Sequence, residues 1–143
     1  MIGAPEIVRE DPGVVTGSWE CIMKHEFEVD GEAGLLTETF TGEISLDLLT
    51  AANTAILNHP EFTAGLNFLT DLREARISFG YNEMGTHVRS LPRLQVVKQA
   101  FVIARDSEYG MIRMFIILTD GKGIFAEARI FRSMEDGVAW CSR

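Results

Sequence analysis

The chain has 143 residues, the usual size of one domain, and 46% of them are hydrophobic, which is enough to bury a core. It carries 13 basic and 21 acidic residues, a net charge of −8, without a basic cluster, so the sequence excludes nucleic acid as a partner. We find neither a secretory signal at the start nor an apolar run of the roughly 20 residues that span a membrane. Two cysteines, Cys21 and Cys141, are too few for a disulfide-stapled secreted domain, so we expect reduced thiols in a cytoplasmic protein.

The first part of the chain predicts an arm and a hairpin. Residues 1–17 contain Pro and Gly without periodicity, which indicates a flexible N-terminal arm before a single domain over 18–143. Apolar residues alternate from Trp19 to Val29, the pattern of a strand. Asp30-Gly31 predicts a turn, and a second strand over Leu35–Thr41 completes the hairpin.

Helices and strands alternate through the rest of the chain. The predicted helices begin at the N-cap candidates Ser45, Ser78, Ser107 and Ser133 and end near Asn58, Pro92, Leu118 and Trp140; the predicted strands cover Leu66–Thr70, Gln99–Ala104 and Ala126–Arg132. Strands that alternate with helices after a hairpin predict the fold class: α/β, with a mixed sheet of about five strands, parallel central strands and about four helices.

Sequence patterns of known catalytic and metal sites are missing. His25, His59 and His87 are scattered, and no His or Cys pair has metal-ligand spacing, so we expect no metal. The sequence has no nucleophile elbow, and Gly121-Lys122-Gly123 is too short for a phosphate-binding loop. We therefore predict a protein that is not an enzyme and has no catalytic residue and no cofactor, although a triad assembled in space has no sequence signature.

Three stretches resemble the STAS domain, and more closely its SpoIIAA-like branch. They are Ile44–Leu48 with the exit His59–Phe62, the strand Asn67–Arg73, and Tyr109–Phe115 followed by Ala128–Arg132 and Ala139-Trp140. The resemblance spans roughly residues 18–142, counted by predicted elements. It implies relatives of anti-sigma-factor antagonists, and an architecture like that of the lipid-transfer CRAL-TRIO proteins, which suggests a hydrophobic cargo and peripheral membrane contact.

The same resemblance implies a phosphorylated Ser in an Asp-Ser-Ser/Thr-Gly turn between the third strand and the second helix. The matching stretch here, residues 73–80, keeps Ser78 and Gly80 but has no Asp before the Ser, and Phe79 replaces a small residue. Asp106-Ser107 contains the dipeptide but lies at a different junction. We therefore predict that Ser78 is not a functional phosphorylation switch.

The third predicted helix is apolar on more than one face. Met111, Met114, Phe115 and Leu118 fit a stripe against the sheet, which leaves Ile112, Ile116 and Ile117 turned elsewhere. Either neighbouring elements cover these isoleucines, or they form an exposed patch. The second alternative predicts a homodimer, because a twofold contact is the commonest way to hide such a patch.

We also expect a ligand pocket between the second and third predicted helices. Gly80 and Gly85 weaken the second helix, so it is expected to be loosely held beside the apolar wall of the third. The predicted ligand-binding residues are Arg73, Tyr81, Met84, Met111, Met114, Phe115 and Leu118. The charged residues Asp71, Arg73, Glu74 and Arg76 follow a predicted strand, where they form either a solvated loop or a ligand-binding edge.

Two functions follow from these observations. The first is a non-enzymatic domain that binds a small apolar or lipid-like ligand. The second is a protein–protein regulatory module related to anti-sigma-factor antagonists, without the phosphorylatable turn.

Overall fold

The computed structural model describes residues 14–16 and 22–142. Its elements are β1 (Val14–Thr16), β2 (Ile22–Asp30), β3 (Leu35–Ile44), α1 (Leu46–Leu57), β4 (Asn67–Ile77), α2 (Tyr81–Ser90), β5 (Val96–Val102), α3 (Asp106–Thr119), β6 (Phe125–Phe131) and α4 (Met134–Cys141). The predicted α/β order, N-terminal hairpin and four helices are confirmed, and β1 adds a short strand inside the segment for which the sequence predicts an arm. Trp19 and Cys21 lie outside the described residues.

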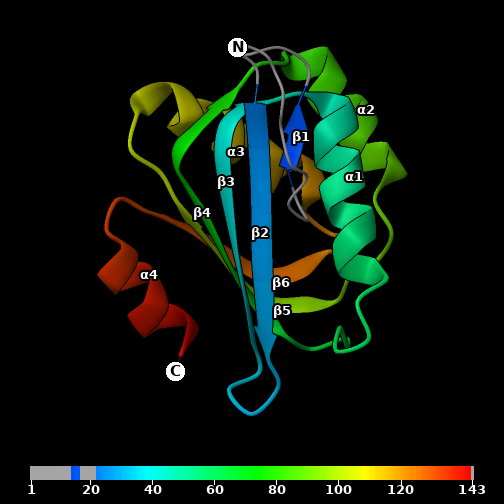
Figure 1. Cartoon of the computed structure of the whole chain (residues 1–143), viewed down its shortest axis with the longest axis vertical. Coiled ribbons are helices and arrows are strands. Elements are labelled where there is room, and N and C mark those ends of the chain that lie inside the picture. Colours follow the sequence, from blue (N-terminus) through cyan, green and yellow to red (C-terminus); the bar gives the residue numbers. More distant parts are fainter. Residues whose placement is uncertain (1–13, 17–21, 143) are drawn as a thin grey trace, which may run out of the picture.

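The strands form one sheet in chain order, β1-β2-β3-β4-β5-β6. β1, β2 and β3 are antiparallel neighbours, whereas β3 to β6 run parallel. Because three right-handed crossovers step across the sheet in one direction, they place α1, α2 and α3 on one face. α4 follows the last strand and covers the other face, where it contacts β4, β5 and β6 (Figure 1).

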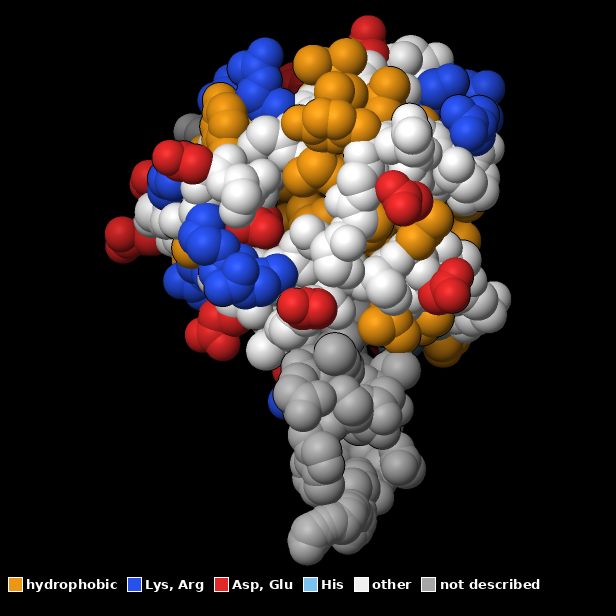
Figure 2. Space-filling model, turned by 90° about the horizontal axis from the view of Figure 1, so that it is seen from above, with side chains coloured by type: hydrophobic (Ala, Val, Ile, Leu, Met, Phe, Trp, Pro, Cys, Tyr) orange, Lys and Arg blue, Asp and Glu red, His pale blue; other side chains and the backbone are white. Residues whose placement is uncertain are grey.

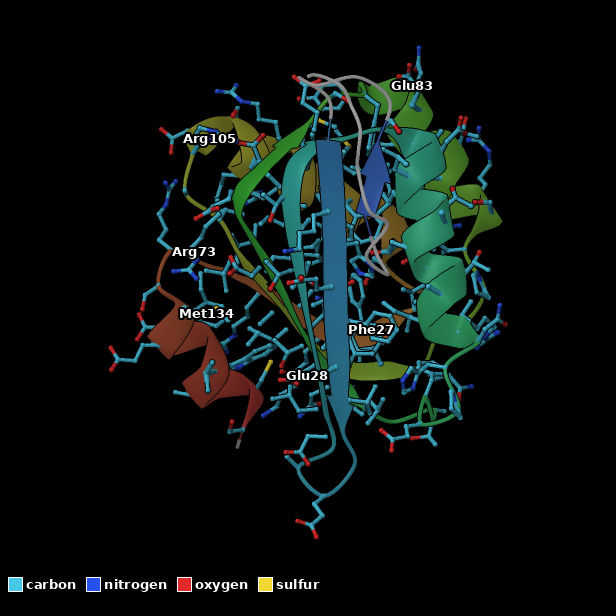
Figure 3. All side chains as sticks on the ribbon, in the orientation of Figure 1. Phe27, Glu28, Arg73, Glu83, Arg105 and Met134 are labelled. Carbon is cyan, nitrogen blue, oxygen red and sulfur yellow. The ribbon has the colours of Figure 1, made fainter. Side chains whose placement is uncertain are left out.

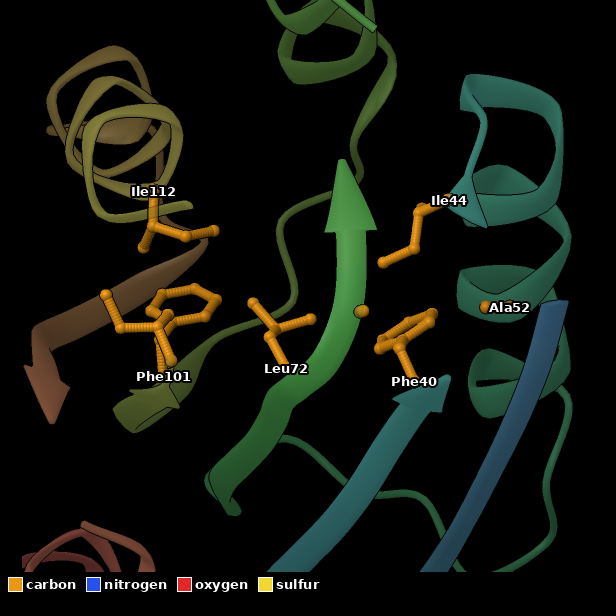
Figure 4. Packing of buried hydrophobic residues seen from close by; sticks show 8 residues of the cluster. Phe40, Ile44, Ala52, Leu72, Phe101 and Ile112 are labelled. Carbon is orange, nitrogen blue, oxygen red and sulfur yellow. The ribbon is translucent and has the colours of Figure 1, made fainter. Parts of the chain in front are cut away.

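The larger core lies between the sheet and α1 to α3. Its buried members are Phe40, Ile44, Ala52, Leu72, Ala75, Phe101, Ile103 and Ile112. Figure 4 shows Ile112 reaching down from α3 toward Phe101, while Leu72 of β4 lies between Phe101 and Phe40. Ser45 caps α1 as predicted, because its Oγ accepts a hydrogen bond from the Leu48 backbone N–H at 3.3 Å.

A smaller core lies beneath α4. Trp140 and Cys141 pack against Leu69, Ala100 and Val102. Ser133 caps this helix through the Asp136 backbone N–H at 3.2 Å, and Trp140 is the anchor that the sequence predicts. Val138, the other predicted anchor, is exposed instead. The close approach of α4 depends on Gly137, where a Cβ atom would lie 3.1 Å from a methyl group of Val102.

The observed strand β4 is longer than the strand that the sequence predicts for the middle of the chain. The strand continues to Ile77, so Asp71, Arg73, Glu74 and Arg76 lie within it and not in a loop. A register shift between β3 and β4 places an extra residue in β4 beside Thr39 and Thr41. This bulge leaves both Arg73 and Glu74 exposed, which hides the strand's alternation in the sequence.

The starts and faces of two helices also differ from the predictions. α2 begins at Tyr81 with Gly80 as N-cap, so Ser78 does not cap it. α3 begins at Asp106 with Arg105 as N-cap, so Ser107 does not cap it. This helix is also rotated by about one residue relative to the predicted stripe. Its buried positions are Glu108, Ile112 and Thr119, so Ile112, which the sequence predicts for a surface patch, is only 4% exposed.

Candidate functional site

A cavity of about 90 Å³ lies between the sheet and the three helices that cover it. It is partly open to solvent, and most of its lining is apolar. Six phenylalanines contribute, from the strands, from the segment before α2 and from α3: Phe40, Phe68, Phe79, Phe101, Phe115 and Phe125. Figure 2 views the molecule from above and shows a band of hydrophobic side chains that runs from the upper edge of the picture toward its middle, with charged side chains to either side.

A row of buried polar side chains crosses neighbouring strands of the sheet, and three of them, Glu38, Thr70 and Gln99, line the cavity. His25 Nε2 lies 2.8 Å from Glu38 Oε1, and the Thr70 hydroxyl donates to Glu38 Oε2 at 2.7 Å. The Gln99 amide nitrogen donates to the Thr70 hydroxyl oxygen at 2.9 Å. All four residues are buried. The hydrogen bonds thus run from Gln99 through Thr70 to the Glu38 carboxylate, which also contacts His25, and they cross an otherwise mainly apolar face.

His87 enters the cavity from α2, and it is 3% exposed. Its Nε2 lies 3.5 Å from the Asn53 amide nitrogen, which donates to it. Its Nδ1 is buried and has no hydrogen-bond partner among the described residues. Burial lowers the pKa of His87 below its usual value, because the charged imidazolium loses water, so the ring is neutral near pH 7. An unpaired polar atom in such a place can be satisfied by a ligand.

Only part of the predicted ligand-binding set lines this cavity. Met84 and Phe115 do, and so does Ile112, which was predicted for a surface patch. Met111, Met114 and Leu118 are half-buried on α3 and are not among the lining residues. Tyr81 is 60% exposed at the start of α2. Of the other two isoleucines of the predicted patch, Ile116 packs against the core and Ile117 is 60% exposed.

Arg73 does not contribute to the cavity. Its guanidinium pairs with Asp71 through two hydrogen bonds of 2.9 Å, and Figure 3 shows it on the side of the sheet where α4 and Met134 lie. Burial alone would raise the pKa of the Asp71 carboxyl, but the hydrogen bonds from Arg73 outweigh burial and lower it. Arg73 is therefore not among the residues that line this cavity, and its role in ligand binding stays a prediction.

The polar residues of the cavity were missed by the sequence analysis. Their signal is weak, because Glu38 lies between two half-buried threonines and Gln99 follows Lys98, so both look like ordinary polar positions of a strand. His87 falls on the buried side of α2 beside Met84 and Val88, at helical spacing. This spacing is enough to predict that His87 faces the core, but it does not predict that the Nδ1 atom is unpaired.

The segment before α2 corresponds to the junction that carries the phosphorylated serine in the family resemblance. The Ser78 hydroxyl donates to the Ile44 carbonyl oxygen at 2.9 Å. Two residues on, the Gly80 backbone N–H donates to the Glu83 carboxylate at 3.0 Å, and Figure 3 marks Glu83 at this end of the molecule. The start of α2 therefore already holds a negative charge, which would repel a phosphate on Ser78.

Within residues 14–16 and 22–142, no group of three His, Cys, Asp or Glu side chains is placed to hold a metal ion. None of the helices in the same ranges is long and apolar enough to cross a membrane.

Comparison with known proteins identifies the fold. No family model matches the sequence, and no curated protein matches it. Two solved structures are similar. An anti-sigma factor antagonist from Mycobacterium paratuberculosis has a TM-score of 0.54 and 13% identity, with 85% of this chain and 95% of that chain covered. An uncharacterized protein with a SpoIIAA-like fold from Shewanella loihica PV-4 has a TM-score of 0.55 and 13% identity, with 89% and 98% covered. This chain therefore has the SpoIIAA-like fold, as the resemblance in its sequence predicts.

Proposed function

We propose that this protein is a non-enzymatic regulatory module that acts by binding another protein. The observation that supports the proposal is its similarity, over 95% of the other chain, to a protein described as an anti-sigma factor antagonist. At 13% identity this similarity concerns the fold, so the proposal needs its own test.

The partner surface that we propose lies at the start of α2. Tyr81 is 60% exposed there, and tyrosine is enriched at protein interfaces because its ring buries area while its hydroxyl stays hydrogen-bonded. Glu83 occupies the same turn, so the partner has to present hydrogen-bond donors or positive charge beside an apolar contact. Binding is expected to depend on this turn and not on phosphorylation of Ser78.

The test is capture of a partner from the native host, followed by reconstitution from two purified proteins and measurement of the dissociation constant. Tyr81→Asp is expected to weaken the complex at least about tenfold, as loss of an interface anchor does. Leu57→Asp is the matched control, because Leu57 is also an exposed apolar residue but ends α1. If no purified pair forms a complex at micromolar concentration, the regulatory function is wrong. Equal weakening by both variants would contradict the proposed surface.

A second candidate function is to carry or sense a small, mainly apolar ligand. The cavity supports it, because a lining rich in phenylalanine surrounds a few buried polar groups, the usual composition of a ligand site. Native mass spectrometry of the purified full chain is expected to show a bound small molecule. A protein that carries no ligand and binds none of the small aromatic probes described below would contradict this candidate.

A further inference from the structure

The geometry points to the chemical class of that ligand: a neutral molecule about the size of one aromatic ring, carrying one oxygen that accepts a hydrogen bond from His87. This inference rests on the second candidate function and specifies what its site selects.

The volume of the cavity limits the size of the ligand. Its volume of about 90 Å³ is smaller than an engineered apolar cavity of about 150 Å³ that holds benzene. A single ring therefore fits only if the side chains relax slightly or if part of the ring extends through the open side. A long acyl chain would leave most of its length outside, so the cavity is too small to enclose the lipid-like cargo that the family resemblance implies.

The lining favours an aromatic ring over an alkyl group of equal size. Phe101 and Phe115 already meet edge to face, with ring centroids 6.0 Å apart, and Phe125 lies 6.0 Å from Phe115. Aromatic rings gain from such edge-to-face and offset contacts beyond the area that they bury. A ligand ring would extend this set of contacts.

The charged groups in the lining set a second limit, which concerns the charge of the ligand. Among the described residues, no Lys or Arg lines the cavity, while the buried carboxylate of Glu38 does. An anionic ligand would therefore lose its hydration, meet a like charge and find no cation in return. The site is therefore expected to disfavour fatty acids, benzoates and phosphates and to select neutral molecules.

His87 supplies the directional contact. Because the Asn53 amide donates to Nε2, the neutral ring carries its proton on Nδ1, and this buried N–H has no acceptor among the described residues. A hydroxyl or carbonyl oxygen of a ligand would satisfy it, which an apolar molecule of the same shape cannot do.

Phenol and toluene test the inference, because they have nearly the same shape and differ in the oxygen. In NMR titrations of the full chain near pH 7, we expect phenol to bind with a millimolar or lower dissociation constant. Replacement His87→Leu is expected to weaken phenol about tenfold while toluene changes by less than about twofold. His87→Gln keeps an N–H donor and is expected to retain most phenol binding. Benzoate is expected to bind at least about tenfold more weakly than phenol.

A plugging variant shows whether the probes enter this cavity. Leu49 and Leu48 are both half-buried on α1 and pack against the same core, but only Leu49 lines the cavity. Leu49→Phe is therefore expected to abolish phenol binding, and Leu48→Phe to preserve it. If His87→Leu leaves phenol unchanged while Leu49→Phe removes both probes, the cavity binds ligands but the role of His87 is wrong. If neither probe binds the native chain, the inference fails. The second candidate function fails as well when native mass spectrometry also shows no bound small molecule.

Discussion

His25 Nε2 and Glu38 Oε1 lie 2.8 Å apart on the sheet face that α1 to α3 cover, where the two residues are 5% and 7% exposed. Phe27 stacks on the His25 ring, and Phe40 packs on it at a tilted angle. A buried pair of this kind rarely gives more stability than two apolar residues would, because both groups lose water. The pair is therefore not a strong source of stability, although its carboxylate lies in the lining of the cavity.

Breaking one side of this pair is expected to cost more than removing both. His25→Leu leaves the buried Glu38 carboxylate with the Thr70 hydroxyl as its remaining contact, so it should lower the free energy of unfolding by about 3–5 kcal/mol. The double variant His25→Leu/Glu38→Leu removes the carboxylate as well and should recover part of that loss. Urea unfolding of the three proteins measures this, and a double variant less stable than His25→Leu would contradict it.

His87 should make the native state sensitive to mild acid. Its folded pKa lies below the 6.5 of an exposed histidine because it is buried, so the unfolded chain binds protons more tightly. Its contribution is complete above pH 6.5 and is lost as the pH falls below that value toward the folded pKa. We expect the stability difference between His87→Leu and wild type to shift in favour of the variant from about pH 7.5 to about pH 5, measured by urea midpoints. An unchanged difference would show that His87 does not titrate as argued.

Two helical glycines should respond oppositely to the same substitution. At Gly137 in α4 a Cβ atom would lie 3.1 Å from Val102 and 3.2 Å from Leu69, so Gly137→Ala forces the helix away from the sheet and should cost about 1–2 kcal/mol. At Gly110 in α3 nothing lies within 4 Å, so Gly110→Ala should stabilise by about 0.5–1 kcal/mol through helix propensity. Thermal unfolding of both variants gives the comparison, and loss of stability at both sites would contradict it.

The elements that the sequence predicts well are those whose signals are local. Ser45 and Ser133 cap their helices through hydrogen bonds within three residues, and the Asp30-Gly31 turn follows from its own composition. β4 was predicted too short because a bulge interrupts its alternation, and the bulge depends on pairing with β3, thirty or more residues away along the chain.

The candidate site was harder to predict for the same reason. His25, Glu38, Thr70 and Gln99 come from four separate strands, and they meet only when the sheet has assembled. The face of α3 was misplaced because every position from Met111 to Leu118 except Arg113 is apolar, so periodicity cannot choose between neighbouring stripes. Glu108 settles the choice: its carboxylate accepts from the Ile77 backbone N–H at 3.3 Å and turns that side of the helix inward.

Ser78 is expected to be dispensable for partner binding. Its hydroxyl is already used by the Ile44 carbonyl oxygen, and the Glu83 carboxylate at the start of α2 disfavours a phosphate beside it. Ser78→Ala should therefore leave the dissociation constant of a reconstituted complex within about twofold of wild type. Stoichiometric phosphorylation of Ser78 in the native host, together with loss of the complex in Ser78→Ala, would overturn this prediction.

We expect the protein to be a homodimer, and the exposure of the side chains on α3 limits which residues can form the contact. Of the three isoleucines in the predicted patch, Ile117 is the one that is exposed, and the half-buried Met111, Met114 and Leu118 lie on the same helix. Burial of such a helix face against a second copy would remove about 25 cal/mol of unfavourable hydration per Å² of apolar surface. Ile117→Asp would place a charge in that contact, whereas Val138→Asp alters an equally apolar, exposed residue of α4 on the opposite side of the sheet. Light scattering at micromolar concentration should give a dimer mass for wild type and for Val138→Asp, and a monomer mass for Ile117→Asp. A monomer mass for wild type would refute the dimer, and a dimer that survives Ile117→Asp would show that it forms through another surface.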